Sequence, residues 1–475
     1  MKDILGYDAT NPKSIEEYAQ KLIGKTFLDV CREDESDLDK AVCEETEYIV
    51  CHENKKRKGG LGELIEERFF HYKCNNDSRP DFPEAGVELK VSPYKINKKG
   101  SVVAKERLII TMIDYFAVID EKFEDSHLWQ KARLILLIYY LYMQEINSRL
   151  DYRIDYVKLF SPPEQDIKII KHDYEVIVDK IRAGKAHELS ESDTLYLGAA
   201  PKAATSQDRR KQPFNVELAK PRAFAFKNSY MTYVLNSYII PDKSMYETVI
   251  REETTDSFED YVVGKINAYR NYALDELCRQ FHIDEGKKAK NIGAMIAYRI
   301  LGIKGNHAEE FEKANIVVKS IRIENNNKIK ESMSFPIFKF KELVQEEWEN
   351  STFGTYLSET RFLFVIYKYN ECGKLYLKGC QFWNMPYQDL NGEVKKVWEK
   401  TKQVLIDGLQ ITRKNGKNYN NFPNASENPV CHVRPHARNA ADTYELPDGR
   451  PYMKQCFWLN NTYILSQIDR GFMMD

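Results

Sequence analysis

Two carboxylates and a lysine lie close together in the segment RPDFPEAGVELKVSPY. Asp81 follows Pro80, and Glu88 and Lys90 lie on either side of Leu89. On a β-strand, Glu88 and Lys90 project from one face and Leu89 from the other. The Pro- and Gly-containing segment after Asp81 can fold back, so both acids could share one hard divalent cation. Such a cation activates a water and neutralises a phosphate, with Lys90 close to that water or to the developing oxyanion.

The same spacing is also common on half-exposed strands whose charged side chains simply face solvent. The pattern alone therefore has two interpretations, a metal-dependent phosphodiester-cutting site or a solvated surface. The elements that would position it depend on the size of the chain. At 475 residues the chain is too long for one core, which predicts two domains. Its 43% hydrophobic and 30% charged residues are typical of a soluble globular protein.

Targeting and membrane signals are not evident in the sequence. Residues 1–14 contain no apolar core, so we expect no secretory signal. The longest apolar run, Leu134–Met143, is about half of what a bilayer requires and predicts a buried strand. The nine cysteines show no CxxC and no zinc-type spacing, which suits a reducing cytoplasm. We therefore expect a cytoplasmic protein.

The net charge of −2 does not by itself indicate nucleic-acid binding. Local basic clusters do permit it, at residues 55–58, 98–99, 209–211, 287–288 and 413–414. Each cluster alone is more typical of a solvated loop. A nuclease would still need a basic cleft. Its basic residues would then have to gather on one face of the folded protein, although they are dispersed along the sequence.

The chain contains two copies of one pattern, in the same order and with similar spacing. The matching segments are 14–18 with 257–261, 31–32 with 278–279, 61–66 with 292–297, 82–90 with 311–319, 105–106 with 330–331, 131–140 with 361–370, and 224–230 with 457–463. This repetition predicts two domains of one α/β fold, 1–240 and 241–475, joined near residues 241–257. In each we expect an N-terminal helical part, a glycine-started helix, a mixed sheet and a C-terminal strand and helix.

The two copies differ at the candidate site. In the second copy, Ala297 replaces Glu66, Glu310 replaces Asp81 and Val317 replaces Glu88, whereas the lysine persists as Lys319. Positions that served only the fold should be treated alike in both copies. The differences therefore predict that the first domain does the chemistry and that the second keeps the scaffold.

With these residues in view, the first domain resembles the MutH-like family of PD-(D/E)xK endonucleases. Over nearly its full length, the chain resembles the type II restriction enzymes of that family that cut at GATC. The segments that carry the resemblance are 58–62, 85–90, 184–190, 222–227, 331–335, 359–364 and 431–436. The resemblance implies two tandem MutH-like domains, each a mixed sheet flanked by helices, the second catalytically degenerate.

The resemblance also implies roles for individual residues. Asp81 and Glu88 match the metal-binding acids of the family, with Mg2+ as the cofactor, and Lys90 matches its catalytic lysine. Glu66 matches a supporting acid, although a solvent-facing helix glutamate is the alternative.

Lys131 matches a further lysine near the site and is aligned with Arg361, so it could contact a phosphate or form a structural ion pair. Lys202 lies in the segment 196–204, which matches a DNA-reading loop. A lysine at a loop tip can donate to the acceptor edge of a guanine, or it can contact a phosphate or remain solvated.

A second DNA-reading strand of the family matches residues 222–227, which makes Arg222 and Lys227 candidate DNA contacts. In the second domain, Arg434 and His436 occupy the place of the DNA-reading loop and predict that this domain still grips DNA. Trp458 is a weaker candidate, because an aromatic side chain in such a strand is buried more often than it stacks on DNA.

We expect a Mg2+-dependent endonuclease that cleaves both strands of DNA at GATC, before the G, leaving a 5′ overhang. The second domain would bind another GATC copy and act allosterically. One competent site per chain favours a monomer that pairs on the two-fold DNA site. A methyltransferase would be the functional partner. The alternatives are a MutH-like nicking enzyme of mismatch repair and a non-cleaving GATC-binding regulator.

Overall fold

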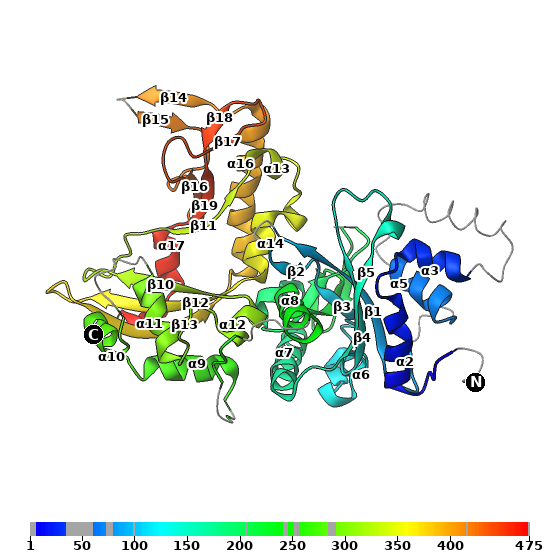
Figure 1. Cartoon of the computed structure of the whole chain (residues 1–475). Helices are drawn as coiled ribbons and strands as arrows, with labels where there is room; N and C mark the ends of the chain where they lie inside the picture. The colour runs from blue at the N-terminus through cyan, green and yellow to red at the C-terminus, as the bar shows by residue number, and fades with distance from the viewer. Residues whose placement is uncertain are drawn as a thin grey trace. The chain divides into compact units, whose positions relative to one another are not determined.

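A computed structural model describes residues 6–34, 60–72, 79–97, 100–205, 207–240, 246–250, 254, 256–283, 291–414 and 417–473 (Figure 1). The chain divides into two compact units. The first comprises residues 1–187, 194–245 and 312–314, and the second comprises 188–193, 246–311 and 315–475. Among the described helices, none has the length and apolar character needed to cross a bilayer.

The first unit is a mixed α/β structure. Its helices are α2 (Pro12–Ala19), α3 (Phe27–Asp34), α5 (Gly60–Leu64) with the π-helical turn η3 (Ile65–Phe69), α6 (His127–Ala132), α7 (Glu164–Arg182) and α8 (Asn228–Val234). Its strands are β1 (Glu88–Ile96), β2 (Val102–Ala104), β3 (Leu108–Met112), β4 (Ile135–Leu141), β5 (Ile154–Phe160), β6 (Leu197–Pro201), β7 (Arg210–Gln212), β8 (Asn215–Ala219) and β9 (Arg222–Phe226).

The strands of the first unit form a sheet in the order β2-β1-β4-β5, a sheet in the order β3-β9-β6, and the β7–β8 hairpin. The β1–β4 pair is parallel, with Glu88 opposite Ile135, whereas β2 and β5 add antiparallel edges. β4 reads ILLIYYL and is buried along almost its whole length, as expected for a central strand covered on both faces. The predicted burial of the apolar run around β4 is therefore confirmed.

The helices of the first unit begin where the sequence supplies caps. Pro12 stands at the first position of α2, and the side chain of Asn11 accepts a hydrogen bond from the N–H of Lys13. Ser126 caps α6 by accepting from the N–H of Trp129. The long helix α7 carries acids in its first turn and bases in its last, which complements the helix dipole, and it buries an apolar stripe that includes Ile170 and Ile177.

The second unit is built from similar elements. Its helices are α9 (Phe258–Asn267), α10 (Leu274–Gln280), α11 (Ile292–Ile300), α12 (Glu309–Ala314, whose last three residues belong to the first unit), α13 (Phe340–Leu343), α14 (Thr352–Glu359), α15 (Tyr387–Asp389), α16 (Lys395–Asp407) and α17 (Asn461–Ser466). Its strands are β10 (Ile316–Ile323), β11 (Met333–Phe338), β12 (Arg361–Tyr369), β13 (Leu375–Trp383), β14 (Ile411–Lys414), β15 (Lys417–Asn420), β16 (Cys431–Pro435), β17 (Thr443–Glu445), β18 (Pro451–Met453) and β19 (Gln455–Leu459).

The strand pairing of the first unit recurs in the second. β10 and β12 form a parallel pair with β13 antiparallel beside β12, and a separate sheet has the order β11-β19-β16. The β17–β18 hairpin lies in the chain between β16 and β19, as β7–β8 lies between β6 and β9. Each unit has its own apolar core, centred on Leu136 and Ile138 in the first and on Phe362 and Phe364 in the second.

The apolar run that predicts a buried strand forms β4 from Ile135, after α6 ends at Ala132. One local expectation was wrong. The segment 196–204 was expected to be a loop, but Leu197–Pro201 forms β6 and pairs with β9. Its small side chains allow this close packing, and only the residues after Pro201 form the loop.

Candidate active site

A short reverse turn places Asp81 beside the strand that carries Glu88 and Lys90. Phe82 and Val87 exchange backbone hydrogen bonds of 2.9 and 3.2 Å, which closes the segment between them. Gly86 in this turn has φ +64°, a left-handed conformation that favours glycine. As a result, Oδ2 of Asp81 accepts a hydrogen bond of 2.8 Å from the N–H of Leu89 at the start of β1.

Glu88 is the centre of a buried charge cluster. Its side chain is only 2% exposed, and its carboxylate receives the Lys90 ammonium at 2.6 Å and the Lys131 ammonium at 3.1 Å. Lys90 reaches it along the same face of β1, whereas Lys131 reaches it from the last turn of α6. The structure therefore brings together Asp81, Glu88, Lys90 and Lys131, all predicted site residues.

The two carboxylates are close enough to act on each other. Burial raises the pKa of Asp81, and the negative charge of Glu88 raises it further, against the opposing effects of the Leu89 N–H and the two lysines. A cation between the carboxylates would remove this repulsion. No group of three or more metal-ligating side chains occurs among the described residues. Two carboxylates nevertheless suffice for Mg2+, which usually completes its octahedron with water and substrate phosphates, so the donor set fits a hard divalent cation.

The turn at Gly86 makes a testable prediction about this geometry. Replacing Gly86 by alanine should lower the free energy of unfolding by about 1–2 kcal/mol, because a Cβ is disfavoured at positive φ. The added Cβ would also lie 2.7 Å from Nη2 of Arg133, which would have to move. The shift should displace Asp81 and reduce any metal-dependent activity of the site. Urea unfolding and cleavage assays measure the two effects.

A matched control lies on α5. A Cβ at Gly62 meets no atom within 4 Å and the residue does not have a left-handed φ, so Gly62→Ala should leave stability unchanged or slightly higher. Equal stability of both variants would show that the turn at Gly86 does not depend on glycine.

Glu66 lies at the second position of the π-helical turn η3 and is half-buried. The preceding helix α5 packs against β1, the strand of Glu88 and Lys90. The charges that shift the pKa of Asp81 are those of Glu88, Lys90 and Lys131. A supporting role for Glu66 stays a prediction.

The equivalent strand of the second unit lacks this cluster. In β10, Val317 and Lys319 have the spacing that Glu88 and Lys90 have in β1. Burial lowers the pKa of Lys319. Glu310, aligned with Asp81, is buried on α12 and accepts hydrogen bonds from the N–H groups of Val249 and Ile250 at 2.8 and 3.0 Å. Its carboxylate therefore holds a backbone segment of its own unit.

The strand registers correct the alignment of Lys131 with Arg361. Glu88 lies opposite Ile135 in the first unit and Val317 lies opposite Phe362 in the second. Lys131 is four residues before Ile135, and the residue four before Phe362 is Ser358. The positive charge of Lys131 is therefore not kept in the second unit.

Arg361 instead forms an ion pair and a hydrogen bond with side chains of its own unit. Its guanidinium is paired with Glu259 at 2.7 Å and donates to Oδ1 of Asn384 at 2.9 Å.

The predicted DNA contacts of the first unit are of two kinds. Lys202 is exposed at the end of β6, where its N–H continues the ladder by donating to the carbonyl of Pro221. Arg222 and Lys227 are buried, and their side chains donate to the carbonyls of Ala199 and Thr194. Because both cations lie inside the unit, the structure argues against direct DNA contacts by Arg222 and Lys227. They brace the sheet that carries Lys202.

Asp173 on α7 is a positioning residue that the sequence interpretation missed. Its carboxylate accepts hydrogen bonds of 2.7–2.9 Å from the N–H groups of Leu195, Tyr196 and Leu197, and so anchors the start of β6. Burial raises its pKa to about 6, against these three donors and the nearby Lys227. The available signal was an acid on the apolar face of an amphipathic helix, where a lone carboxylate requires partners.

In the second unit, Arg434 and His436 are exposed around Trp458. The Arg434 guanidinium lies 4.4 Å from the centre of the indole ring, and the His436 ring lies 5.4 Å from it. Arg434 lies near the end of β16 and His436 directly follows that strand, as Lys202 directly follows β6.

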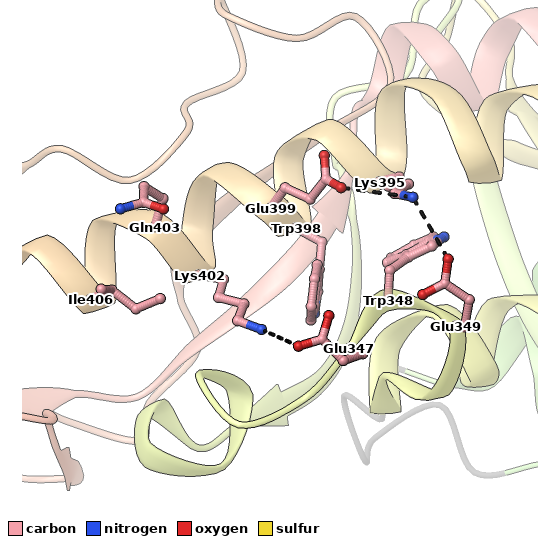
Figure 2. Close-up of a pocket in the computed structure, with 9 residues that line it drawn as sticks. All are labelled: Glu347, Trp348, Glu349, Lys395, Trp398, Glu399, Lys402, Gln403 and Ile406. Atoms are coloured by element: carbon pink, nitrogen blue, oxygen red, sulfur yellow. Dashed lines mark hydrogen bonds and ion pairs between the residues drawn. The ribbon is translucent and has the colours of Figure 1, made fainter. Parts of the chain in front are cut away.

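A concavity of about 250 Å3 lies elsewhere in the second unit, between α16 and the turn at Trp348 (Figure 2). Trp348 and Trp398 form its walls, and ion pairs join Lys402 to Glu347 and Lys395 to Glu349 and Glu399 (Figure 2). Its three acids and two lysines do not suit a polyanion, and it contains none of the predicted site residues.

Comparison with known proteins gives consistent matches. A family model described as "DNA mismatch repair enzyme MutH" matches residues 70–173, which include Asp81, Glu88, Lys90 and Lys131. The chain is 38% identical over 460 residues to the type II restriction enzyme Sau3AI of Staphylococcus aureus, covering 87% of this chain and 93% of that protein. It is 26% identical over 187 residues to the DNA mismatch repair protein MutH of Shewanella sp. (strain MR-7), covering 38% of this chain and 80% of that protein.

Proposed function

The chain belongs to the MutH-like family of restriction endonucleases, and from that membership we propose that it cleaves both strands of duplex DNA at GATC as a type II restriction enzyme. It is a DNA nuclease by its similarity to Sau3AI and to the MutH family model. The observation that carries the proposal is the cluster of Asp81, Glu88, Lys90 and Lys131 in the first unit. The equivalent strand of the second unit, β10, has Val317 in place of Glu88.

Each residue of the cluster has a part in hydrolysis. Asp81 and Glu88 would hold Mg2+, which supplies an activated water and charge neutralisation at the phosphate. Lys90 orients that water and stabilises charge that develops on the phosphate oxygens. Lys131 offsets the charge of Glu88 from α6, and Glu66 supports the cluster from η3. The products are 5′-phosphate and 3′-hydroxyl ends, with a 5′ overhang because the cut falls before the G.

The second unit acts as a degenerate copy that binds DNA without cutting it. Support comes from the recurring strand pairing, from Val317 and Ser358 at the positions of Glu88 and Lys131, and from the exposed Arg434 and His436. Occupation of this unit by a second GATC copy would raise cleavage at the first, as a coupling between two sites. Since the described part of each chain contains one such cluster, two chains pair on the palindrome to cut both strands.

Incubating plasmid DNA with the purified protein, with and without Mg2+, tests the proposal. We expect linear fragments that carry GATC overhangs in the presence of Mg2+ and intact plasmid in its absence. Relaxed circles alone would favour a nicking enzyme instead. The match to the restriction enzyme covers 87% of the chain and the match to MutH 38%, which supports double-strand cleavage. A gel shift without product would favour a GATC-binding regulator.

The same assay on plasmid methylated at GATC examines the functional partner. A methyltransferase of the same specificity would protect the host DNA, and we expect methylation of one base of the site to block cleavage. The protein acts in the bacterial cytoplasm, where that DNA lies.

A further inference from the structure

The β7–β8 hairpin of the first unit exposes apolar side chains and docks through polar ones. Phe214 is 75% exposed, Val216 98% and Leu218 49%. On the docked side, Gln212 accepts a hydrogen bond from the N–H of Ala186 at 2.7 Å, and Asn215 donates to the carbonyl of Gly184 at 2.8 Å. A surface hairpin normally has the opposite polarity, so this arrangement needs an explanation.

The hairpin is held firmly rather than loosely. A Cβ added at Gly184 would lie 3.0 Å from the carbonyl oxygen of Phe214, so the hairpin packs tightly on the turn after α7. The side-chain amide of Gln212 also contacts Nδ1 of His187 at 2.9 Å and the carbonyl of Glu217 at 2.6 Å. Its apolar face is therefore presented in a fixed pose.

Phe214 adds backbone strain to this exposure. It stands at φ +61°, where glycine or asparagine is the usual residue and a bulky side chain is costly. Its ring is largely solvent-exposed, so it gains little burial within the unit to offset that cost. Strain of this kind is characteristic of sites that bind something else.

The corresponding hairpin of the second unit, β17–β18, has neither feature. Its turn uses Gly449 for the left-handed position, at φ +86°. Asp448 and Arg450 form an ion pair of 2.7 Å beside it, and the apolar residue of the turn, Leu446, is buried. Of these two corresponding hairpins, the one with the exposed apolar face therefore belongs to the unit that carries the carboxylate cluster.

The charge beside the apolar face indicates the occupant. Arg210 and Lys211 are exposed on β7, directly after Arg209. Lys202 is exposed at the start of the segment that joins β6 to this hairpin. Apolar wedges flanked by cations are the means by which many proteins enter a DNA groove and unstack base steps. Three side chains are too few for a stable interface with a second copy, which needs about 800 Å2 from each partner.

We propose that the β7–β8 hairpin is a wedge that inserts Phe214 and Val216 into a groove of the bound duplex and places Arg210 and Lys211 on the adjoining phosphates. The wedge bends the DNA and so fixes its position relative to the cluster at Asp81. This inference rests on the proposed function only in taking duplex DNA as the substrate.

Binding of a GATC duplex labelled at both ends tests the wedge, with affinity read from anisotropy and bending from energy transfer. The Asp81→Asn background prevents cleavage during the measurement. Phe214→Asn and Val216→Ser should each weaken binding on the order of tenfold and reduce bending, without changing the dependence on salt. Lys211→Ala should instead lower the salt slope by about one, as expected for one lost phosphate contact.

Two features make this test selective. Asparagine tolerates a left-handed φ, so Phe214→Asn should keep or raise the melting temperature, which separates lost binding from lost folding. Phe116→Asn removes an aromatic ring that is 53% exposed in the same unit but outside the hairpin, and should change neither affinity nor bending.

Unchanged affinity and bending in both apolar variants would overturn the wedge, even if the wild-type protein cuts plasmid normally. Loss of self-association in the absence of DNA, with DNA binding retained, would assign the face to a second copy and equally overturn it. If the wild-type protein neither binds the duplex nor cuts plasmid, the proposed function fails together with the wedge.

Discussion

Replacing Asp81 by asparagine is expected to reduce DNA cleavage by at least about a thousandfold and to leave binding of a GATC duplex within about threefold. The amide is nearly isosteric and its oxygen can still accept from the N–H of Leu89, so the turn is preserved. The change removes one of the two charges proposed to hold the divalent cation. Plasmid cleavage under single-turnover conditions and anisotropy with a labelled duplex give the two quantities.

The second unit supplies the matched control. Glu310 is also buried and also accepts backbone hydrogen bonds, so Glu310→Gln makes the same chemical change at the aligned position. It should leave cleavage of a single-site duplex unchanged within about threefold. The Asp81→Asn protein should be no less stable than the wild type, because burial and Glu88 disfavour its carboxylate. Retained cleavage in the Asp81 variant, or equal losses in both variants, would contradict the assignment of the site.

Much of the site could be predicted from the sequence because short-range rules determine it. The period of a strand places Glu88 and Lys90 on one face, and their ion pair in β1 agrees with that placement. A glycine in the segment after Asp81 predicts a reversal, and the structure forms one at Gly86. The apolar run around β4 predicts a buried strand, and the structure forms one there.

Longer-range features could not be predicted in the same way. Two strands rich in Ile, Leu, Phe and Tyr can be aligned equally well in several registers, so the sequence pattern alone aligns Lys131 with Arg361. The hydrogen-bond ladder fixes the register and gives Ser358 instead. The hydrophobic pattern of a strand specifies which of its faces is buried, but the register is specified by its pairing with the neighbouring strands.

The burial of Arg222 and Lys227 could also not be predicted from the sequence. A cation in an apolar strand can face DNA or can turn inward when the fold supplies partners. Here the inward partners are the carbonyls of Ala199 and Thr194, and they come from strand pairings and loops distant in sequence. The sequence places Asp173 on an apolar helix face, where it requires partners, but only the structure identifies these partners as the N–H groups at the start of β6.

Two lysines at equivalent strand positions provide the second large prediction. Lys90→Met should reduce cleavage by at least about a hundredfold, because it removes the ammonium proposed to act beside the attacked phosphate. The fold should tolerate the change, since Lys131 still balances Glu88. Lys319→Met in the second unit should leave cleavage of a single-site duplex unchanged. The cleavage rate and the free energy of unfolding of both variants are the measurements.

The free energy of unfolding of the Lys319→Met variant, relative to that of the wild type, should depend on pH. Burial lowers the pKa of Lys319 below its unfolded value, so its ammonium destabilises the folded state at neutral pH. Methionine should therefore raise the free energy of unfolding by on the order of 1 kcal/mol at pH 7. This gain should be full below the lowered pKa and should disappear as the pH rises past about 10.4, above which the lysine becomes neutral in both states. A gain that persists above that pH would mean that shape rather than charge is responsible. A loss of cleavage in this variant would show that the second unit takes part in the chemistry through this lysine, against its proposed role as a scaffold that binds DNA.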